Sequence, residues 1–388
     1  MYAKSDPSLI SEVRNYGLFD AKACFQCGSC TLTCNLTSNA AAFPRRTFRF
    51  TIFGLRKHLL ASLEPWLCYY CGDCSIACPR QTEPGEGMMT LRRFLTAYYD
   101  WTGLSKRIYR SRLWEIGSMV LVGLLVLLLG GYYHIQTVGL EYGDLISEEY
   151  ITEIMAEGFM AHMFGLIKTF TILIFLFPVL ILLINAFRMY WFTMHKGTEF
   201  KIPFSVYLTE AKTLVLHAVT QKRFKDCESN RRWLIHGLLV FGCVLMSVLV
   251  VFFLEWFQTD NIYPLYHPQR WLGYLATAAL IIASVEIIIG RIRKRSETHK
   301  ISDFSDWTLP VLLLLTAVSG IVLHIFRYLG YSFAVHFTYA IHLAITAPLL
   351  VIEIPFGKLS HMLYRPLAIY FNTVREKALQ NELKGEID

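Results

Sequence analysis

Six long runs of apolar residues follow one another along the chain after residue 110. They occupy residues 113–133, 159–187, 233–256, 271–290, 307–328 and 332–356. Each run is long enough for an α-helix to cross the ~30 Å hydrocarbon core of a bilayer. Tryptophans, which favour the membrane–water interface, stand at the ends of several runs, for example Trp114, Trp256 and Trp307. The pattern predicts six transmembrane helices.

The polar loops between these runs differ in charge. The loop at 188–232 holds nine Lys and Arg residues, whereas the loop at 135–158 holds six acids and neither Lys nor Arg. Basic loops remain on the cytoplasmic side of a membrane. We therefore expect a multi-pass protein of the cytoplasmic (inner) membrane, with residues 1–112 and the C-terminus on the cytoplasmic side.

Composition agrees with a membrane protein, since 54% of the 388 residues are hydrophobic. The net charge of +7 comes from Lys and Arg that crowd beside the apolar runs, so we expect no nucleic-acid partner. No apolar run precedes residue 110, so the sequence predicts no signal peptide.

Eight of the ten cysteines lie between residues 24 and 78, in two runs of the form C-x2-C-x2-C-x3-C. In two-cluster ferredoxins this spacing places three thiolates on one cubane and sends the fourth to the other cubane. The predicted ligands of one [4Fe–4S] cluster are Cys24, Cys27, Cys30 and Cys78, and those of the second are Cys68, Cys71, Cys74 and Cys34. Two structural zinc sites are the alternative, which two complete four-cysteine runs disfavour. Cys227 and Cys243 lack ligand spacing, and we interpret both as structural.

The pattern between the two cysteine runs predicts a helix over residues 49–60 rather than a hairpin. The predicted fold class is therefore all-α, in three parts. Residues 1–105 form a helical ferredoxin domain with two clusters, residues 106–370 form a six-span cytochrome b bundle, and residues 371–388 form a cytoplasmic tail. A further amphipathic helix at 202–224 is expected to lie along the membrane surface.

Histidines inside the apolar runs are candidate haem ligands, because polar side chains are costly in a membrane and haem iron binds imidazoles from facing helices. His236, just inside the third run, and His361, after the sixth, are predicted to lie at the same cytoplasmic level and to bind one haem b. His342 is predicted to lie in the outer half and to bind a second haem b, with His324 or, alternatively, His162 as its partner. For each histidine, a bond to a backbone carbonyl is the alternative.

Three charged residues within the runs are further candidates. Lys168 would suit a haem propionate or a quinone carbonyl, unless it extends to the interface instead. Glu353 and Glu286 are candidates for taking protons from quinol, since carboxylates in membranes often mark proton routes.

With these motifs the chain resembles the membrane component of the quinone-interacting membrane-bound oxidoreductases of sulfur metabolism. In that family an iron–sulfur protein of the heterodisulfide reductase C type is fused to a cytochrome b similar to the gamma component of nitrate reductase. The resemblance rests on the paired cysteine runs, on Glu83-Pro-Gly-Glu-Gly-Met-Met-Thr-Leu-Arg-Arg-Phe-Leu-Thr, and on the ending from His342 through Pro355-Phe-Gly-Lys-Leu-Ser-His361 to Tyr364-Arg-Pro.

Two features depart from the pattern of the nitrate reductase gamma component. Met246 stands where the third helix would carry its second histidine, so the resemblance does not supply the second ligand of the outer haem. His342 and His361 are nineteen residues apart rather than eighteen, which separates them by about 100° on a continuous helix unless Pro348 or Pro355 kinks it.

The resemblance implies an electron-transfer subunit of a quinone-dependent oxidoreductase complex. Menaquinol would be oxidised beside a haem, and the electrons would pass through two haems b and two clusters to cytoplasmic flavoproteins. The implied partners are two flavoproteins that contain FAD and iron–sulfur clusters, related to the A-type component of heterodisulfide reductase, and, through them, adenylylsulfate reductase. The membrane arm of a heterodisulfide reductase is the nearest alternative, and a membrane anchor with structural metal but no turnover is a second one.

Overall fold

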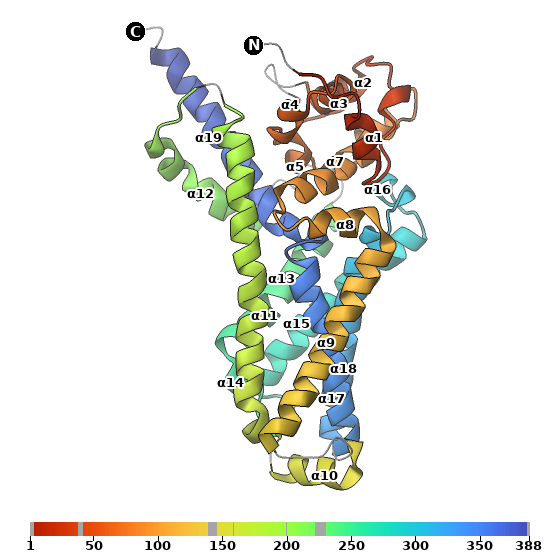
Figure 1. Ribbon diagram of the computed structural model, residues 1–388, viewed down its shortest axis with the longest axis vertical. Coiled ribbons are helices and arrows are strands. Elements are labelled where there is room, and N and C mark those ends of the chain that lie inside the picture. Colours follow the sequence, from red (N-terminus) through yellow and green to blue (C-terminus); the bar gives the residue numbers. More distant parts are fainter. Residues whose placement is uncertain are drawn as a thin grey trace.

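The structure is a computed structural model that describes residues 4–37, 42–138, 146–157, 159–198, 200–221 and 230–385. For residues 137–138, 154–157, 159–164, 166 and 383–385 it describes the backbone alone. The described residues form helices and contain no strand, which confirms the predicted all-α fold. Figure 1 shows two parts, a compact group of short helices at one end and a long bundle below it.

The N-terminal part consists of eight helices. These are α1 (Leu9–Arg14), α2 (Ser29–Thr33), α3 (Arg45–Ile52), α4 (Arg56–Leu60), α5 (Glu64–Leu67), α6 (Asp73–Ile76), α7 (Pro84–Tyr99) and α8 (Leu104–Arg110). The central helix α7 begins with Pro84, whose fixed φ suits a first helical position. Met88, Leu91 and Leu95 recur on one face of α7 at helical spacing and are fully buried.

The single helix predicted over residues 49–60 is wrong, because the chain forms two helices there. Helix α3 ends at Ile52, and Gly54 adopts φ +67° before α4 begins at Arg56. A Cβ at Gly54 would collide with the backbone of Asp6, so only glycine fits this turn.

Six helices are long and apolar enough to span a membrane, as the hydrophobic pattern predicts. These segments are Arg112–Gln136, Ile167–His195, Asn230–Phe252, Pro268–Ile292, Ser305–Tyr328 and Ser332–Glu353. They belong to α9 (Arg112–Val138), α11 (Phe159–Tyr190, prolonged by a π-helical turn at Trp191–His195), α13 (Asn230–Phe252), α15 (Pro268–Ile292), α17 (Ser305–Tyr328) and α18 (Ser332–Pro348, prolonged by a π-helical turn at Leu349–Glu353). Leucines such as Leu121 and Leu128 remain exposed on α9, as expected of a surface that faces lipid.

The spans pack in the spatial order α13, α15, α17, α18 and α9, and α11 packs against the π-helical turn at Leu349–Glu353 that ends the last span. Two glycines allow close approach in this bundle. A Cβ at Gly123 would lie 2.8 Å from the carbonyl oxygen of Ala344, and one at Gly242 would lie 3.0 Å from that of Ala276. Small residues at such crossings are typical of helix packing in membranes.

The remaining helices connect these elements. They are α10 (Glu148–Glu157), α12 (Phe204–Thr220), α14 (Leu254–Phe257), α16 (Glu297–Lys300) and α19 (His361–Gly385). On α12 the side chains of Phe204, Leu208, Val215 and Val219 form one exposed apolar face, while Tyr207 contacts Tyr370 of α19. This helix agrees with the amphipathic segment expected at 202–224, although residues 222–224 lie outside the described part of the chain.

The last span is not continued by one helix to His361, and the break falls at Pro355, one of the two prolines at which the sequence allowed a kink. After the π-helical turn at Leu349–Glu353 the chain turns sharply, and His361 opens a new helix. Pro355 has no N–H to continue the ladder, and the carboxylate of Glu353 instead accepts from the backbone N–H of Lys358 at 3.0 Å. The orientation of His361 is therefore set by this turn.

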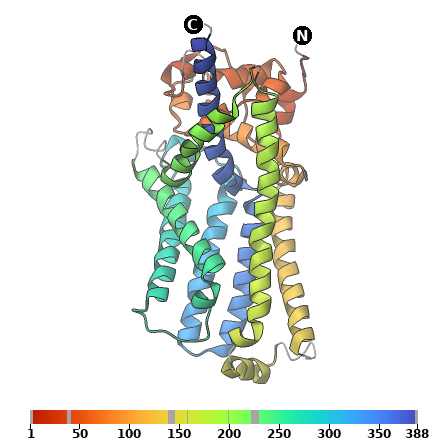
Figure 2. The same cartoon turned by 90° about the vertical axis from the view of Figure 1, so that its left-hand side faces the viewer.

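One hydrophobic core joins the N-terminal part to the bundle. Trp66 of α5 and Tyr99 of α7 pack against Tyr364 of α19, with ring centroids 5.0 and 5.5 Å from the Tyr364 ring. Met189 of α11 and Val374 of α19 are buried in the same cluster. The expected tail at 371–388 therefore includes a packed stretch of α19, and the described ends of the chain lie at the same end of the molecule (Figures 1 and 2).

Candidate metal centres

Two pockets gather the eight clustered cysteines, four in each. The Cys24 pocket is lined by Cys24, Cys27, Cys30 and Cys78. The Cys68 pocket is lined by Cys68, Cys71, Cys74 and Cys34. Each pocket thus takes three cysteines from one run and the fourth from the other run, which is the grouping predicted from the spacing.

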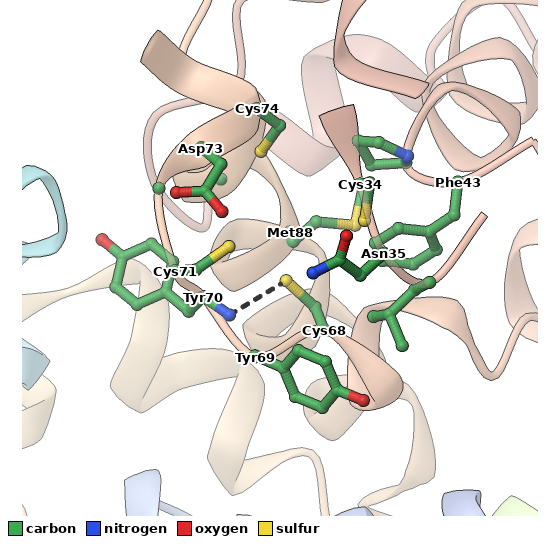
Figure 3. Close-up of a pocket in the computed structure, with 14 residues that line it drawn as sticks. Cys34, Asn35, Phe43, Cys68, Tyr69, Tyr70, Cys71, Asp73, Cys74 and Met88 are labelled. Atoms are coloured by element: carbon green, nitrogen blue, oxygen red, sulfur yellow. Dashed lines mark hydrogen bonds between the residues drawn. The ribbon is translucent and has the colours of Figure 1, made fainter. Parts of the chain in front are cut away.

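The thiols of the Cys68 pocket point into a common space between α6 and α7, with Met88 and Phe43 on its wall (Figure 3). Cys68 and Cys74 are buried, and the Sγ of Cys68 accepts a hydrogen bond from the backbone N–H of Tyr70 at 3.3 Å. Backbone donors to sulfur are a means by which proteins tune iron–sulfur clusters.

The Cys24 pocket is more open. The Sγ of Cys24 accepts from the side-chain amide of Gln26 at 3.2 Å, and the Sγ of Cys78 lies 3.3 Å from the hydroxyl of Thr82. Cys27 is exposed, and a hydrogen bond with Ser29 lowers the pKa of its thiol. This pocket is therefore accessible from solution.

The two cysteine runs share one backbone design. Gln26 and Tyr70 adopt φ values of 56° and 55°, and Gly28 and Gly72 adopt φ values of 91° and 98° immediately before α2 and α6. A positive φ favours glycine because L side chains meet the backbone there. The repeated turn wraps the first three cysteines of each run around its pocket.

Both pockets fit a cluster better than a single ion. Among the described residues, no three His, Cys, Asp or Glu side chains converge closely enough to hold one metal ion. The four thiols that line each pocket match the four thiolate ligands that a cubane takes. Burial raises the pKa of Cys34 to about 11 and that of Cys71 to about 12, so these sulfurs need bound metal to remain as thiolates.

The rings of His236 and His361 lie next to each other at the junction between the bundle and the N-terminal part, in an edge-on arrangement. Their ring centroids are 6.2 Å apart, with an angle of 63° between the planes. Two imidazoles that bind one iron from opposite sides, with bonds of about 2 Å, have ring centres about 6 Å apart. The pair therefore has the separation that a six-coordinate haem iron requires.

The hydrogen bonds of both rings orient the pair. His236 Nδ1 lies 2.5 Å from the side-chain oxygen of Gln221, and His361 Nδ1 bonds to the carbonyl oxygen of Lys358. An Nδ1 that donates a proton leaves the lone pair on Nε2, the usual arrangement for a metal-binding histidine. The residues fit haem at this level.

The outer candidates have separate partners. His342 Nδ1 bonds to the hydroxyl of Ser319 at 2.8 Å, whereas His324 bonds to the hydroxyl of Tyr274 at 2.7 Å. No ring contact between His342 and His324 occurs among the described side chains. The side chain of His162 lies outside the described residues, so the second ligand of the outer haem stays a prediction.

The charged candidates are paired with other side chains. Lys168 forms an exposed ion pair with Glu255 of α14 at 3.3 Å. Glu286 accepts from Arg231 at 2.7 Å and from Arg295 at 2.8 Å, while Glu353 is buried beside Lys358. Their predicted roles toward quinone stay predictions, and Cys227 lies outside the described residues.

Sequence reasoning missed a group of arginines between the histidine pair and the Cys68 pocket. Arg92 and Arg365 both donate to the carbonyl oxygen of Cys68, with Arg365 at 3.3 Å, and Arg232 donates to the carbonyl oxygen of Tyr70. Arg365 follows His361 by four residues and Arg232 precedes His236 by four. This one-turn spacing was a signal that both arginines share a helix face with a candidate ligand.

A buried ion-pair network was also missed. Arg93 of α7 lies 3.2 Å from Glu86 and 3.1 Å from Asp306 of α17, and Lys358 bonds to the same Asp306. Tyr70 donates to Glu86 at 2.5 Å. The network joins the N-terminal part to the bundle.

The comparisons with known proteins agree with the cysteine geometry. Residues 23–82 match the family of 4Fe-4S dicluster domains. The chain is therefore a helical membrane protein that carries a dicluster iron–sulfur segment.

The relatives are iron–sulfur components of heterodisulfide reductases. The second C-type iron–sulfur component of the CoB–CoM heterodisulfide reductase of Methanocaldococcus jannaschii is 38% identical over 71 residues, which is 18% of this chain and 38% of the relative. The C-type component of the ferredoxin:CoB-CoM heterodisulfide reductase of Methanosarcina acetivorans is 33% identical over 70 residues, 18% of this chain and 28% of the relative. This chain thus spans less than half of either relative, and no solved structure matches it.

Proposed function

We propose that this protein is the membrane subunit of a quinone-linked oxidoreductase complex. It would transfer electrons between menaquinol and cytoplasmic flavoproteins, through two b haems and two [4Fe–4S] clusters. The eight cysteines of the two pockets would hold the clusters, His236 and His361 would hold the inner haem, and His342 would hold the outer haem. The N-terminal part and α19 would face the cytoplasm, as the basic loops favour.

One observation carries this proposal. Arg365, one turn beyond His361, bonds at 3.3 Å to the carbonyl oxygen of Cys68, which would ligate a cluster. A candidate haem site and a candidate cluster site therefore share a hydrogen-bonded connection. When bound, haem and cluster would each accept and release one electron without a change in covalent bonds.

The chain's own residues would hold these groups in place and exclude water. Gln221 and the carbonyl of Lys358 orient the two imidazoles. The buried rings of Trp66, Tyr99 and Tyr364 pack in one hydrophobic cluster with the helix that begins at His361. The carboxylate of Glu353 is buried near the cytoplasmic end of the last span, where it would receive a proton released from quinol.

The family resemblance supplies the proposed partners. These are two flavoproteins related to the A-type component of heterodisulfide reductase and, through them, adenylylsulfate reductase. The relatives favour a second candidate, the membrane arm of a heterodisulfide reductase-type complex. Isolation of the native complex separates the two, since adenylylsulfate-dependent quinol oxidation supports the first and disulfide-dependent oxidation supports the second.

The test of the haem assignment uses single histidine variants of the purified chain. His236→Ala and His361→Ala should each remove the same one of two b haems, halving the reduced-minus-oxidised α-band absorbance. His299→Ala, at a ring that lies outside the spans, serves as the control and should retain both haems. Full haem content in both ligand variants, or wild-type pigment that a menaquinol analogue fails to reduce, contradicts the proposal.

A further inference from the structure

The two cysteine pockets differ in what covers them. The Cys68 pocket is covered by elements of the bundle. Arg365 and Arg232 bond to the backbone of its loop, and the hydroxyl of Tyr70 lies 3.3 Å from the carbonyl oxygen of Thr298. A Cβ at Gly72 would lie 2.7 Å from the Cβ of Glu297, so α16 rests directly on this pocket.

Among the residues that the structure describes, those that line the Cys24 pocket all belong to the N-terminal part, from Cys24 to Pro84. Its Cys27 is exposed. Helix α2 carries Cys30, which lines this pocket. Figure 1 shows α2 at the end of the molecule away from the spans. The exposed Cys27 makes this pocket accessible to a soluble molecule.

The surface around this pocket is unusually apolar for a face that points away from lipid. We call it the Cys24 face and define it by Phe25, Leu32, Ile76 and Arg80. Phe25 is 69% exposed, Leu32 is 90% exposed and Ile76 is 69% exposed. Leu32 stands two residues after Cys30 on α2, and Ile76 stands two residues before Cys78 on α6, which packs against α2. Exposed apolar groups gathered at a functional pocket are typical of a protein interface.

The charge of this face restricts what binds it. The residues that line the Cys24 pocket include Arg45 and Arg80 but no Asp or Glu, and the guanidinium of Arg80 lies 4.5 Å from the ring centre of Phe25. A partner with acidic groups around an apolar centre complements this surface. Lipid is a poor occupant, since the spans lie at the opposite end of the molecule (Figure 2).

We propose that the Cys24 pocket is the exit of the electron path and that a soluble redox protein with an acidic rim docks on the Cys24 face. This inference rests on the proposed function and deepens it. The cluster that Cys68, Cys71, Cys74 and Cys34 would hold would pass one electron to the cluster that Cys24, Cys27, Cys30 and Cys78 would hold. That second cluster would in turn be oxidised as it reduces a flavin or metal cofactor of the partner, with quinol as the initial reductant.

The fourth cysteine of each run lines the pocket of the other run, and this exchange favours electron transfer from the Cys68 pocket to the Cys24 pocket. Cys30 and Cys34 lie at the two ends of one helical turn but line different pockets, and Cys74 and Cys78 do the same. Two covalent connections of four residues each therefore join the pockets. Electron tunnelling weakens steeply with distance, so this close connection favours transfer between them.

The order is tested by removing one cluster at a time from the full-length chain in membranes. After addition of a menaquinol analogue, Cys27→Ala should leave the Cys68-pocket cluster reducible, as seen in the EPR spectrum of a rapidly frozen sample. Cys71→Ala should leave the Cys24-pocket cluster oxidised although the haem is reduced. The opposite pattern overturns the order, whereas a wild-type haem that quinol fails to reduce means that the proposed function itself is wrong.

The docking face is tested without touching a cysteine. Leu32→Glu places a charge at a 90% exposed position, so the fold and both clusters should remain intact. Binding of the soluble subunits released from the native complex by salt should weaken at least tenfold, while quinol still reduces both clusters. Ile76→Glu should act in the same way, and Phe53→Glu, at an exposed residue outside this face, is the matched control. Unchanged binding in both face variants, or equal loss in the control, overturns the proposal.

Discussion

Replacement of Arg93 tests whether the N-terminal part is bound to the bundle by buried charge. The guanidinium lies 3.2 Å from Glu86 and 3.1 Å from Asp306, with only 7%, 3% and 6% of the three side chains exposed. Arg93→Met keeps the length of the side chain but leaves two buried carboxylates without their shared cation. Removing one partner of a buried ion pair costs about 3–5 kcal/mol of folding stability, and we expect the free energy of unfolding of Arg93→Met to fall by an amount in that range.

The pH dependence of this loss follows from Glu86. Burial raises the pKa of Glu86, and the charge of Arg93 opposes that rise. Without Arg93 the pKa rises further, so the carboxyl group takes up a proton at a higher pH in the folded variant. A raised pKa makes the ionised form costly in the folded state. The destabilisation should therefore be largest at alkaline pH, where Glu86 must ionise, and shrink as the pH falls and the buried carboxyl group takes up a proton.

The assay is guanidinium unfolding of the detergent-solubilised chain, followed by tryptophan fluorescence and by retention of cluster absorbance. Lys300→Met is the matched control, because Lys300 and Glu297 form an exposed pair with 56% and 24% of their side chains accessible. Lys300→Met should change the free energy of unfolding by no more than about 0.5 kcal/mol. A loss below about 1 kcal/mol for Arg93→Met, or one that does not depend on pH, would refute the reasoning.

Three further outcomes follow from the sites. Gly72→Ala should destabilise the Cys68 pocket more than Gly28→Ala destabilises the Cys24 pocket. The reason is that a Cβ at Gly72 would lie 2.7 Å from Glu297, whereas one at Gly28 would lie 3.4 Å from the nearest atom. The iron content that remains after mild heating measures the difference. Gln221→Ala should weaken haem retention roughly 10–100-fold in a competition with apomyoglobin, since it removes the acceptor that orients His236, and unchanged retention counts against the pair. Removal of the clusters with a chelator under oxidising conditions should leave the haem spectrum intact.

The hydrophobic pattern was sufficient to predict six spans, since the length and apolar content of a bilayer-crossing helix are local properties of the sequence. The cysteine spacing likewise predicted which thiols share a pocket. Local pattern failed at one bend, where Gly54 divides one expected helix in two. The turn after Glu353 lies at Pro355, where the sequence allowed a kink, but how that turn orients His361 was not predictable from the sequence.

The charged contacts around the sites could not be predicted from the local sequence pattern. Arg93 and Asp306 lie 213 residues apart in sequence, and nothing in either segment specifies the other. The arginines near Cys68 come from three helices that meet only after folding. The outer histidines show the same limit, because the identity of a ligand pair depends on how two helices rotate against each other.

The packing of Trp66, Tyr99 and Tyr364 has a mechanical consequence. Trp66 stands two residues before Cys68, and Tyr364 stands three residues after His361, so ring-to-ring contact connects the candidate cluster site to the candidate haem site. The separation between the two sites is then set by aromatic contact rather than by the peptide that links the halves. A chain cleaved between Asp100 and Gly103 should hold together, with its conducting geometry unchanged.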